Sequence, residues 1–249
     1  RCARFLLDTM RDERGRLLHR YRDGDAAIAG NADDYAFLSL GLFDLYEATH
    51  EPSYLRESER LMAEMLDLFW DEANGAFFFT PDDGETLLAR KKDVYDGAVP
   101  SANSVALLSL LRLAGVLARP EFEERASELS RAVSGTVGHY PSAYTMFLSA
   151  LDYGLGPSIE LVIAGEPGSR DTEALLRTVR GRFTPNAVML LRPAGNAVET
   201  IALAPWIEHH VPVDGRAAAY VCRDHECMLP VTDPAELARE LAGSTDSTR

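Results

Sequence analysis

Two stretches of the chain that lie 41 residues apart begin with the same three residues and then become apolar. The sequence is PSANSVALLSLL from Pro100 and PSAYTMFLSAL from Pro141. The spacing equals about one helical hairpin with its loops, which indicates an internal repeat. This repeat favours a fold that is built from successive helical pairs over the first roughly 155 residues.

The helices predicted around this repeat are of two alternating kinds. Residues 34–49, 101–117 and 141–154 are apolar on nearly every side, which is typical of buried helices. Residues 53–69 and 120–134 are amphipathic. This alternation predicts an inner and an outer ring of helices. Because only three inner helices are present, we expect an incomplete (α/α)6 barrel, or toroid, over residues 1–155.

The pattern changes after residue 155, where short β-branched runs replace the long apolar helices. We expect strands at 158–165, 186–193 and 217–222, and helices at 171–183 and 233–243. Asp171 and Asp233 precede or begin these helices and are expected as N-caps. The strand–helix–strand order predicts parallel pairing of the first two strands. The second region, residues 156–249, is therefore expected to be a small α/β region after a mainly α one.

Composition and charge exclude several classes of protein. The net charge of −14 and the lack of a basic stripe argue against binding to nucleic acid. No apolar run reaches the roughly 18 residues that span a membrane, so no membrane contact is expected. Three cysteines fit a cytoplasmic protein. The chain begins with Arg1 inside a helical pattern, so we expect a fragment of a longer protein.

Four long segments resemble one known family, and they follow in the same order. They are RYRDGDAAIAGNADDYAFLSLGLFDLYEAT, LFWDEANGAFFFT, RKKDVYDGAVPSANSVALLSLLRL and AAAYVCRDHECMLPVTDPAEL. The family is that of the thioredoxin-fused, spermatogenesis-associated proteins and their bacterial relatives. The resemblance implies an N-terminal thioredoxin-like domain joined to a six-hairpin glycosidase-like barrel, similar to that of N-acylglucosamine 2-epimerase and cellobiose epimerase.

The same resemblance implies that this chain holds the last part of the barrel and a C-terminal region. Its expected partners are the absent thioredoxin-like domain and the first barrel hairpins of the same parent protein. No cofactor is implied. The activity of the family is poorly defined, so the resemblance implies a fold more strongly than it implies a reaction.

Polar residues gather where the predicted inner helices begin, and a barrel would bring those N-termini to one mouth. The expected catalytic carboxylates are Asp33, Asp34, Asp93 and Asp96. The expected substrate-binding residues are Tyr35, Arg90, Lys92, Ser101, Asn103, His139 and Tyr144. Sugar hydrolysis needs two carboxyl groups roughly 5–10 Å apart, and epimerisation needs a base beside a carbonyl. We therefore expect a small-molecule sugar as the substrate.

Structural roles remain open for the same residues. Asp33 and Asp34 are equally suited to favour a helix dipole at its start, and Ser101 and Ser142 to act as N-caps. Arg90 and Asp93 could form no more than an ion pair. The function hypotheses are a sugar epimerase, isomerase or glycosidase-like site, and, alternatively, a non-catalytic barrel that binds partners for the fused domain.

Cys222 and Cys227 flank a four-residue segment that contains His225. We favour two structural thiols. The alternatives are a reversible disulfide and a zinc site completed by His209 and His210. No metal is expected, because a second cysteine pair is missing.

Overall fold

The computed structural model describes residues 1–223 and 226–243 and divides into two compact units. The first unit comprises residues 1–111 and 120–151, and the second comprises residues 112–119 and those from 152 onward. The predicted domain boundary at residue 155 stays a prediction. No helix among the described residues has the length and apolar character needed to cross a membrane.

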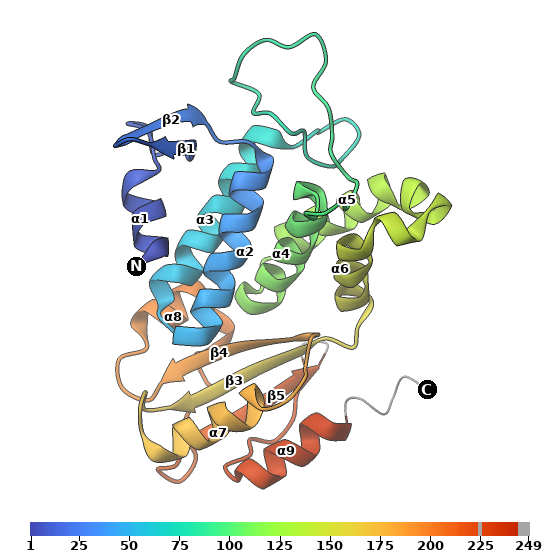
Figure 1. Cartoon of the computed structure of the whole chain (residues 1–249). Helices are drawn as coiled ribbons and strands as arrows, with labels where there is room; N and C mark the ends of the chain where they lie inside the picture. The colour runs from blue at the N-terminus through green and yellow to red at the C-terminus, as the bar shows by residue number, and fades with distance from the viewer. Residues whose placement is uncertain (224–225, 244–249) are drawn as a thin grey trace. The chain divides into compact units, whose positions relative to one another are not determined.

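The first unit is mainly helical (Figure 1). Its elements, some of which continue into the second unit, are α1 (Cys2–Thr9), β1 (Leu18–Arg22), β2 (Asp25–Ala29), α2 (Ala32–Thr49), α3 (Pro52–Phe69), α4 (Ala102–Leu117), α5 (Pro120–His139), η1 (Pro141–Ala143) and α6 (Thr145–Leu155). The helices therefore follow the predicted segments closely. The predicted arrangement of these helical pairs as part of an (α/α)6 barrel stays a prediction.

Helices α2 and α3 pack against each other along their lengths. Between them lies a reciprocal pair of buried hydroxyls, in which Ser39 Oγ donates to the Ser58 carbonyl (2.9 Å) and Ser58 Oγ donates to the Ser39 carbonyl (2.8 Å). Aromatic side chains fill the core beside them, and Tyr35, Phe43 and Tyr46 are fully buried. Small side chains at the centre of the pair thus allow close helix packing, while the aromatic rings supply most of the buried apolar area.

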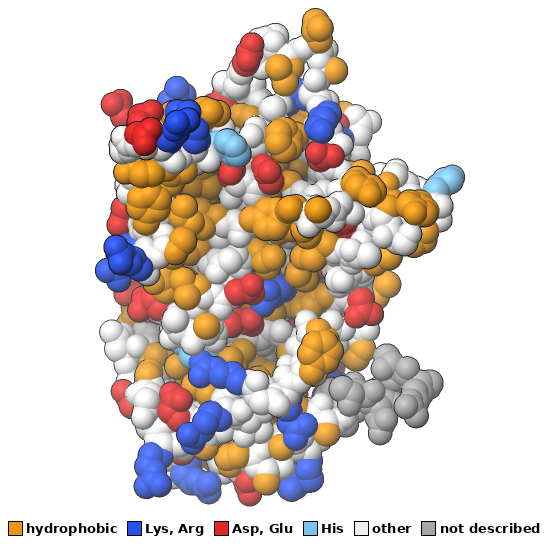
Figure 2. All heavy atoms as spheres, viewed as in Figure 1, with side chains coloured by type: hydrophobic (Ala, Val, Ile, Leu, Met, Phe, Trp, Pro, Cys, Tyr) orange, Lys and Arg blue, Asp and Glu red, His pale blue; other side chains and the backbone are white. Residues whose placement is uncertain are grey.

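Helix α2 differs from its prediction in one respect. A helix buried on nearly every side was expected, but Phe37 is 37% exposed and Gly41 is also exposed. Figure 2 shows hydrophobic side chains gathered on the face of this unit where α1 and α2 lie. One side of α2 is therefore an accessible apolar surface.

The hairpin of β1 and β2 was missed by the helical prediction. Its turn is Asp23-Gly24, and both residues have positive φ (53° and 87°), as a two-residue hairpin turn requires. The predicted turn at Asn74-Gly75 is confirmed, with Gly75 at φ 70° and a β-bridge that joins Trp70 to Phe77. Both turns, Asp23-Gly24 and Asn74-Gly75, thus consist of residues that tolerate a left-handed backbone.

The second unit holds a four-stranded sheet of order β4-β3-β5-β6. Its elements are β3 (Ile159–Gly165), α7 (Arg170–Arg180), β4 (Ala187–Pro193), α8 (Val198–Leu203), η2 (Pro205–Ile207), β5 (Ala218–Arg223), β6 (Glu226–Cys227) and α9 (Pro234–Gly243). The pairing of β3 with β4 is parallel, as predicted, and β5 adds an antiparallel edge. Helices α7 and α9 cover one face of this sheet, which buries Leu161, Leu176 and Leu237 in a common core (Figure 1).

Of the two predicted caps in this unit, one is confirmed. Asp233 Oδ1 accepts a hydrogen bond from the N–H of Ala235 (2.7 Å) at the start of α9. The prediction for Asp171 was wrong, because the N-cap position of α7 is Ser169. Asp171 lies in the first turn and accepts from the N–H of Ala217 (2.8 Å). That hydrogen bond is the main reason why the pKa of Asp171 is lowered to about 2.

Gly165 marks the closest approach between β3 and its neighbours in the second unit. A Cβ atom there would lie 2.2 Å from Thr172 Oγ1 and 2.8 Å from Ala217 Cβ. We expect Gly165→Ala to lower the free energy of unfolding of this unit by roughly 1–3 kcal/mol, because the interior has no room for the methyl group. Urea unfolding followed by Trp206 fluorescence, in a Trp70→Phe background, measures this unit alone.

Gly135→Ala in α5 is the matched control for this prediction. Apart from the neighbouring residues and backbone of its own helix, no atom of the described residues lies within 4 Å of a Cβ at that position, and the backbone there is helical. The control should raise stability by about 0.5–1 kcal/mol through helix propensity, as judged by circular dichroism. Equal effects of the two substitutions would contradict the packing argument.

Candidate functional site

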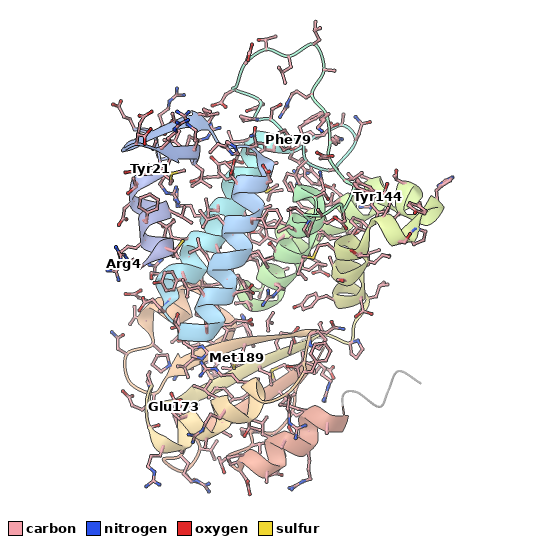
Figure 3. The ribbon with its side chains drawn as sticks, viewed as in Figure 1. Arg4, Tyr21, Phe79, Tyr144, Glu173 and Met189 are labelled. Atoms are coloured by element: carbon pink, nitrogen blue, oxygen red, sulfur yellow. A yellow bond between two sulfur atoms is a disulfide. The ribbon has the colours of Figure 1, made fainter. Side chains whose placement is uncertain are left out.

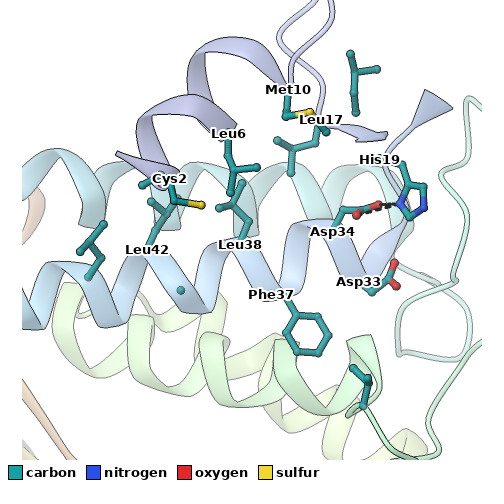
Figure 4. A pocket seen from close by; sticks show the side chains of 15 residues that line it. Cys2, Leu6, Met10, Leu17, His19, Asp33, Asp34, Phe37, Leu38 and Leu42 are labelled. Carbon is teal, nitrogen blue, oxygen red and sulfur yellow. Dashed lines mark hydrogen bonds and ion pairs between the residues drawn. The ribbon is translucent and has the colours of Figure 1, made fainter. Parts of the chain in front are cut away.

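A cavity of the first unit lies between α1, the start of β1 and α2, and it has a volume of about 660 Å³ (Figure 4). Its lining is mostly apolar, and its side chains include Cys2, Leu6, Met10, Leu17, Phe37, Leu38, Leu42, Leu45 and Val99. Polar groups stand at one end only, where His19, Asp33 and Asp34 line the wall. An apolar cleft of this size with a few convergent polar groups is typical of a small-molecule site.

The helix start of α2 positions the two carboxylates. Asn31 is the N-cap, and its backbone N–H donates to Asp34 Oδ2 (2.8 Å), which completes a capping box. The prediction of a helix-start role for Asp34 is therefore confirmed. The same carboxylate also contacts an imidazole, since His19 Nδ1 lies 2.9 Å from Asp34 Oδ2. Asp34 is thus fixed from two sides, by its own helix and by strand β1.

Asp33 has a different environment on the adjacent position of the helix. Its Oδ1 atom is buried and finds no hydrogen-bond partner among the described residues. Burial raises the pKa of Asp33 above its ordinary value of 3.8, and the negative charge of Asp34 raises it further, whereas His19 acts in the opposite direction. In Figure 4 the Asp33 side chain extends away from the His19–Asp34 pair.

These two environments make the carboxyl groups chemically unequal. Asp33 binds its proton more tightly than an ordinary aspartate, while Asp34 accepts hydrogen bonds from a backbone N–H and an imidazole. A carboxyl group with a raised pKa beside a fixed carboxylate is suited to transfer a proton to or from a bound molecule. The cavity therefore contains the elements of an acid–base site.

The other two predicted catalytic carboxylates do not line this cavity. Asp96 is buried and serves the backbone: Oδ1 accepts from the N–H of Ser101 (2.9 Å), and Oδ2 accepts from the N–H groups of Met146 (2.9 Å) and Phe147 (3.1 Å). Asp93 is half-buried and pairs with Lys91 (3.1 Å). Both oxygens of Asp96 hold helix starts, so these contacts support a structural role, and its catalytic role stays a prediction.

Ser101 and Asn103 were expected to bind substrate and instead bind protein. Ser101 caps α4, since its Oγ accepts from the N–H of Ser104 (3.2 Å), which confirms the alternative of an N-cap. Asn103 is 1% exposed; its Oδ1 accepts from the N–H of Phe77 (2.8 Å), and its Nδ2 donates to the carbonyls of Phe77 (3.0 Å) and Asp93 (2.8 Å). The side-chain amide of Asn103 thus makes the hydrogen bonds that a neighbouring strand would otherwise make to this loop.

Tyr35 and Arg90 are likewise engaged within the protein. Tyr35 is fully buried, and its hydroxyl accepts from the N–H of Leu17 (3.1 Å) and from Arg16 Nε (3.2 Å). The Arg90 guanidinium donates to the carbonyls of Thr80 and Leu68. Their predicted contact with a substrate stays a prediction.

Lys92 forms an ion pair with Asp71 (2.6 Å) and donates to the Gly75 carbonyl. The bond from Lys92 is the main cause of a lowered pKa of Asp71. Phe79, labelled in Figure 3, belongs to the same region, where its carbonyl accepts from the N–H of Ala32 (2.9 Å) at the start of α2. The charged residues of this segment therefore stabilise the loop that precedes α4.

The remaining predicted binding residues, His139 and Tyr144, do not line this cavity. His139 is exposed at the end of α5 and contacts the carbonyl of Gly135 (2.6 Å). Tyr144, labelled in Figure 3, is buried at the start of α6 and packs edge to face with Tyr95. The predicted N-cap Ser142 was wrong, since it lies inside η1 and Asp96 occupies the start of α6.

In the second unit, Cys222 and Cys227 form a disulfide, so the favoured prediction of two free structural thiols was wrong. His210 Nε2 lies 3.4 Å from Cys227 Sγ. Burial lowers the pKa of His210, and the charges of Arg192 and His209 lower it further. His225, between the two cysteines, lies outside the described residues.

His19 is the site residue that the sequence prediction missed. No helix or strand was predicted for its segment, so nothing placed it near the predicted site residues. The Asp23-Gly24 turn could have revealed it, since a hairpin at that turn places residues 18–22 in a strand beside the start of α2.

Comparison with known proteins identifies homologues that match most of the chain. No family model matches the chain. It is 36% identical to rat spermatogenesis-associated protein 20 and 35% identical to the human protein, each over 213 residues, which is 85% of the chain. It is 29% identical over 246 residues to uncharacterized protein B0495.5 of Caenorhabditis elegans. The chain spans about a quarter (27%) of the length of the mammalian proteins.

The role of Asp96 predicts a large loss of stability when its carboxylate is removed. Asp96→Ala leaves three backbone N–H groups without their acceptor, so we expect the free energy of unfolding to fall by roughly 3 kcal/mol. Asp93→Ala is the matched control, because the Asp93 carbonyl that Asn103 binds remains; it should change stability by no more than about 0.5 kcal/mol. Chemical denaturation of both variants tests this, and a similar small effect of each would refute the role assigned to Asp96.

The environment of Asp33 predicts opposite responses to two neighbouring substitutions. Asp34→Asn removes a negative charge and should lower the pKa of Asp33, whereas His19→Ala removes one of the groups that oppose the shift and should raise it. Titration of the Asp33 carboxyl carbon by NMR measures both changes. An Asp33 pKa at or below 3.8 in the unaltered chain, or the same pKa in all three proteins, would contradict the assigned environment.

Proposed function

We propose that this chain, which is homologous to the spermatogenesis-associated protein 20 family, carries a sugar-processing site in the cavity between α1 and α2. The reaction is epimerisation or isomerisation of a reducing sugar, in which a proton moves to or from the carbon beside the carbonyl. Because the chain spans 27% of the rat and human proteins, this proposal concerns the site and leaves the whole protein's activity open.

One observation carries the proposal: the partnerless buried oxygen of Asp33, with its raised pKa, lies in the cavity wall. A general base works best when its pKa is close to the working pH, and a raised pKa moves an aspartate in that direction. The cavity of about 660 Å³ falls in the range of roughly 300–1,000 Å³ that is usual for small ligands.

Each of these cavity residues has a separate role in such a reaction. Asp33 accepts or returns the proton. The Asp34 carboxylate, held by His19 and by the N–H of Asn31, keeps a negative charge beside Asp33 and so sustains its proton affinity. Phe37, on the same helix face, offers an aromatic surface for the apolar side of a sugar ring. A hydrolase is less well supported, because the second carboxyl group of the cavity, that of Asp34, is held by His19 and the N–H of Asn31, and neither Asp93 nor Asp96 lines the cavity.

A second candidate is a non-catalytic site that binds a partner, such as a thioredoxin-like domain of the same parent protein. Its support is the largely apolar lining, together with the exposure of Phe37 and of Val99, which is 64% exposed. Exposed apolar side chains in a contiguous patch are typical of a surface that another protein covers.

Incubation of the chain in deuterated buffer with a panel of reducing mono- and disaccharides tests the first candidate. We expect the C2 proton signal of one sugar to disappear in the NMR spectrum. Asp33→Asn should slow this exchange by a factor of about 100 or more, since it removes the group that transfers the proton. Asp93→Asn is the matched control and should leave the rate unchanged.

Saturation-transfer NMR on the same samples separates the two candidates. Binding of a sugar without exchange would overturn the epimerase proposal and leave a sugar-binding site. If the folded chain neither binds nor exchanges any sugar of the panel, the sugar proposal fails and the partner-binding candidate is the better account.

A further inference from the structure

A second cluster of reactive side chains lies in the second unit, apart from the acid–base cavity. It consists of Cys222 on β5, Cys227 on β6 and His210, which follows η2. One ligand atom from each of these residues lies within 4.8 Å of the other two. The cysteines are partners in the antiparallel register of β5 and β6, so the sheet itself brings their side chains together.

Aromatic side chains fix the imidazole of His210. Its ring packs edge to face against Trp206 (5.4 Å between ring centroids) and against Tyr220 (4.6 Å). Both neighbours are anchored in turn, since Trp206 Nε1 donates to the Val116 carbonyl (2.9 Å) and the Tyr220 hydroxyl donates to the Val211 carbonyl (2.7 Å). The ring therefore has a defined position, with Nε2 toward the sulfur of Cys227.

The separations suit a tetrahedral zinc ion. With zinc–sulfur bonds of about 2.3 Å and zinc–nitrogen bonds of about 2.0 Å, a tetrahedral site places a ligand nitrogen about 3.5 Å from a ligand sulfur. His210 Nε2 already lies 3.4 Å from Cys227 Sγ. Once the disulfide bond is broken, side-chain rotation lets the two sulfurs separate to the ~3.8 Å that two thiolate ligands need.

We propose that reduction of the Cys222–Cys227 disulfide creates a zinc site formed by the two thiolates and His210 Nε2. A dithiol reductant transfers two electrons and two protons to the disulfide and becomes a disulfide itself, leaving two thiols on the chain. Zn²⁺ then displaces the two thiol protons, and the charges of two thiolates balance that of the ion. The oxidised chain lacks thiolates and does not bind the metal, so the site responds to the redox state.

The difference in exposure between the two cysteines supports this arrangement. Cys222 is 1% exposed, whereas Cys227 is on the exposed strand β6. A metal ion and a reductant can therefore reach the outer sulfur, while the inner one is protected from other reactions. With three protein ligands, the fourth position of the zinc would be filled by water, as in sites that keep one open position.

Co²⁺ is the spectroscopic probe for this site. The chain is reduced with a phosphine, transferred to oxygen-free buffer without reductant, and titrated with Co²⁺ and then with Zn²⁺. We expect a thiolate-to-cobalt charge-transfer band and tetrahedral d–d bands that saturate at one Co²⁺ per chain and vanish when Zn²⁺ is added. The oxidised chain should show none of these bands. Thiol counts should rise from one, for Cys2, to three on reduction.

Substitutions assign the ligands. Cys227→Ser and His210→Gln should each weaken binding by more than about tenfold, since even changes beyond the ligands themselves often cost that much. Cys2→Ser and His209→Ala are the matched controls and should leave the affinity unchanged. Circular dichroism of each variant confirms that the sheet is folded.

Two results would overturn the proposal. One is a reduced, folded chain that develops no charge-transfer band with Co²⁺. The other is a band that persists in folded His210→Gln at full affinity, or that disappears in Cys2→Ser, because the bound metal would then have other ligands.

Discussion

One buried carboxylate, that of Asp96, determines where two helices of the first unit begin. It accepts the first free N–H groups of α6 and the N–H that precedes α4. The segment between Trp70 and α4 contains no helix or strand ladder, so side chains satisfy part of its backbone beside the few backbone hydrogen bonds that it makes. Asp96, within this segment, and Asn103, in the first turn of α4, make such side-chain hydrogen bonds. The apolar helix can be buried there only because these polar groups bind the loop in front of it.

Much of this fold could be predicted from the sequence, because the helices have a strong apolar pattern. The predicted segments 53–69 and 101–117 agree with α3 and α4 to within one residue at either end. The β-α-β order correctly gave parallel pairing in the second unit. The hairpin of β1 and β2 was missed because its strands are short, exposed and charged, and such strands lack the alternation that a pattern search detects.

The candidate site was less predictable, because residue type does not reveal whether a polar group faces backbone or ligand. Asn103 and Ser101 are as suited to bind a sugar as to bind a loop, and only the fold shows that they bind the loop. Asp33 and Asp34 were correctly singled out as neighbouring carboxyl groups. Their inequality depends on the burial of Asp33 and on the contacts of Asp34 with the N–H of Asn31 and with His19 of β1. In the same way, the sequence left the state of Cys222 and Cys227 open, and the strand register brings them together.

The irregular segment before α4 is held at its base and free at its tip. The N–H of Phe79 donates to the Lys91 carbonyl (2.8 Å), which closes the base, whereas the residues from 84 to 89 are exposed and Leu88 is fully so. Lengthening a loop beyond a closed base costs little free energy, since closure entropy grows only slowly with length. Homologues can therefore differ in length here. Cleavage by a protease or insertion of a peptide tag at this tip would leave the contacts of Asp96 and Asn103 in place.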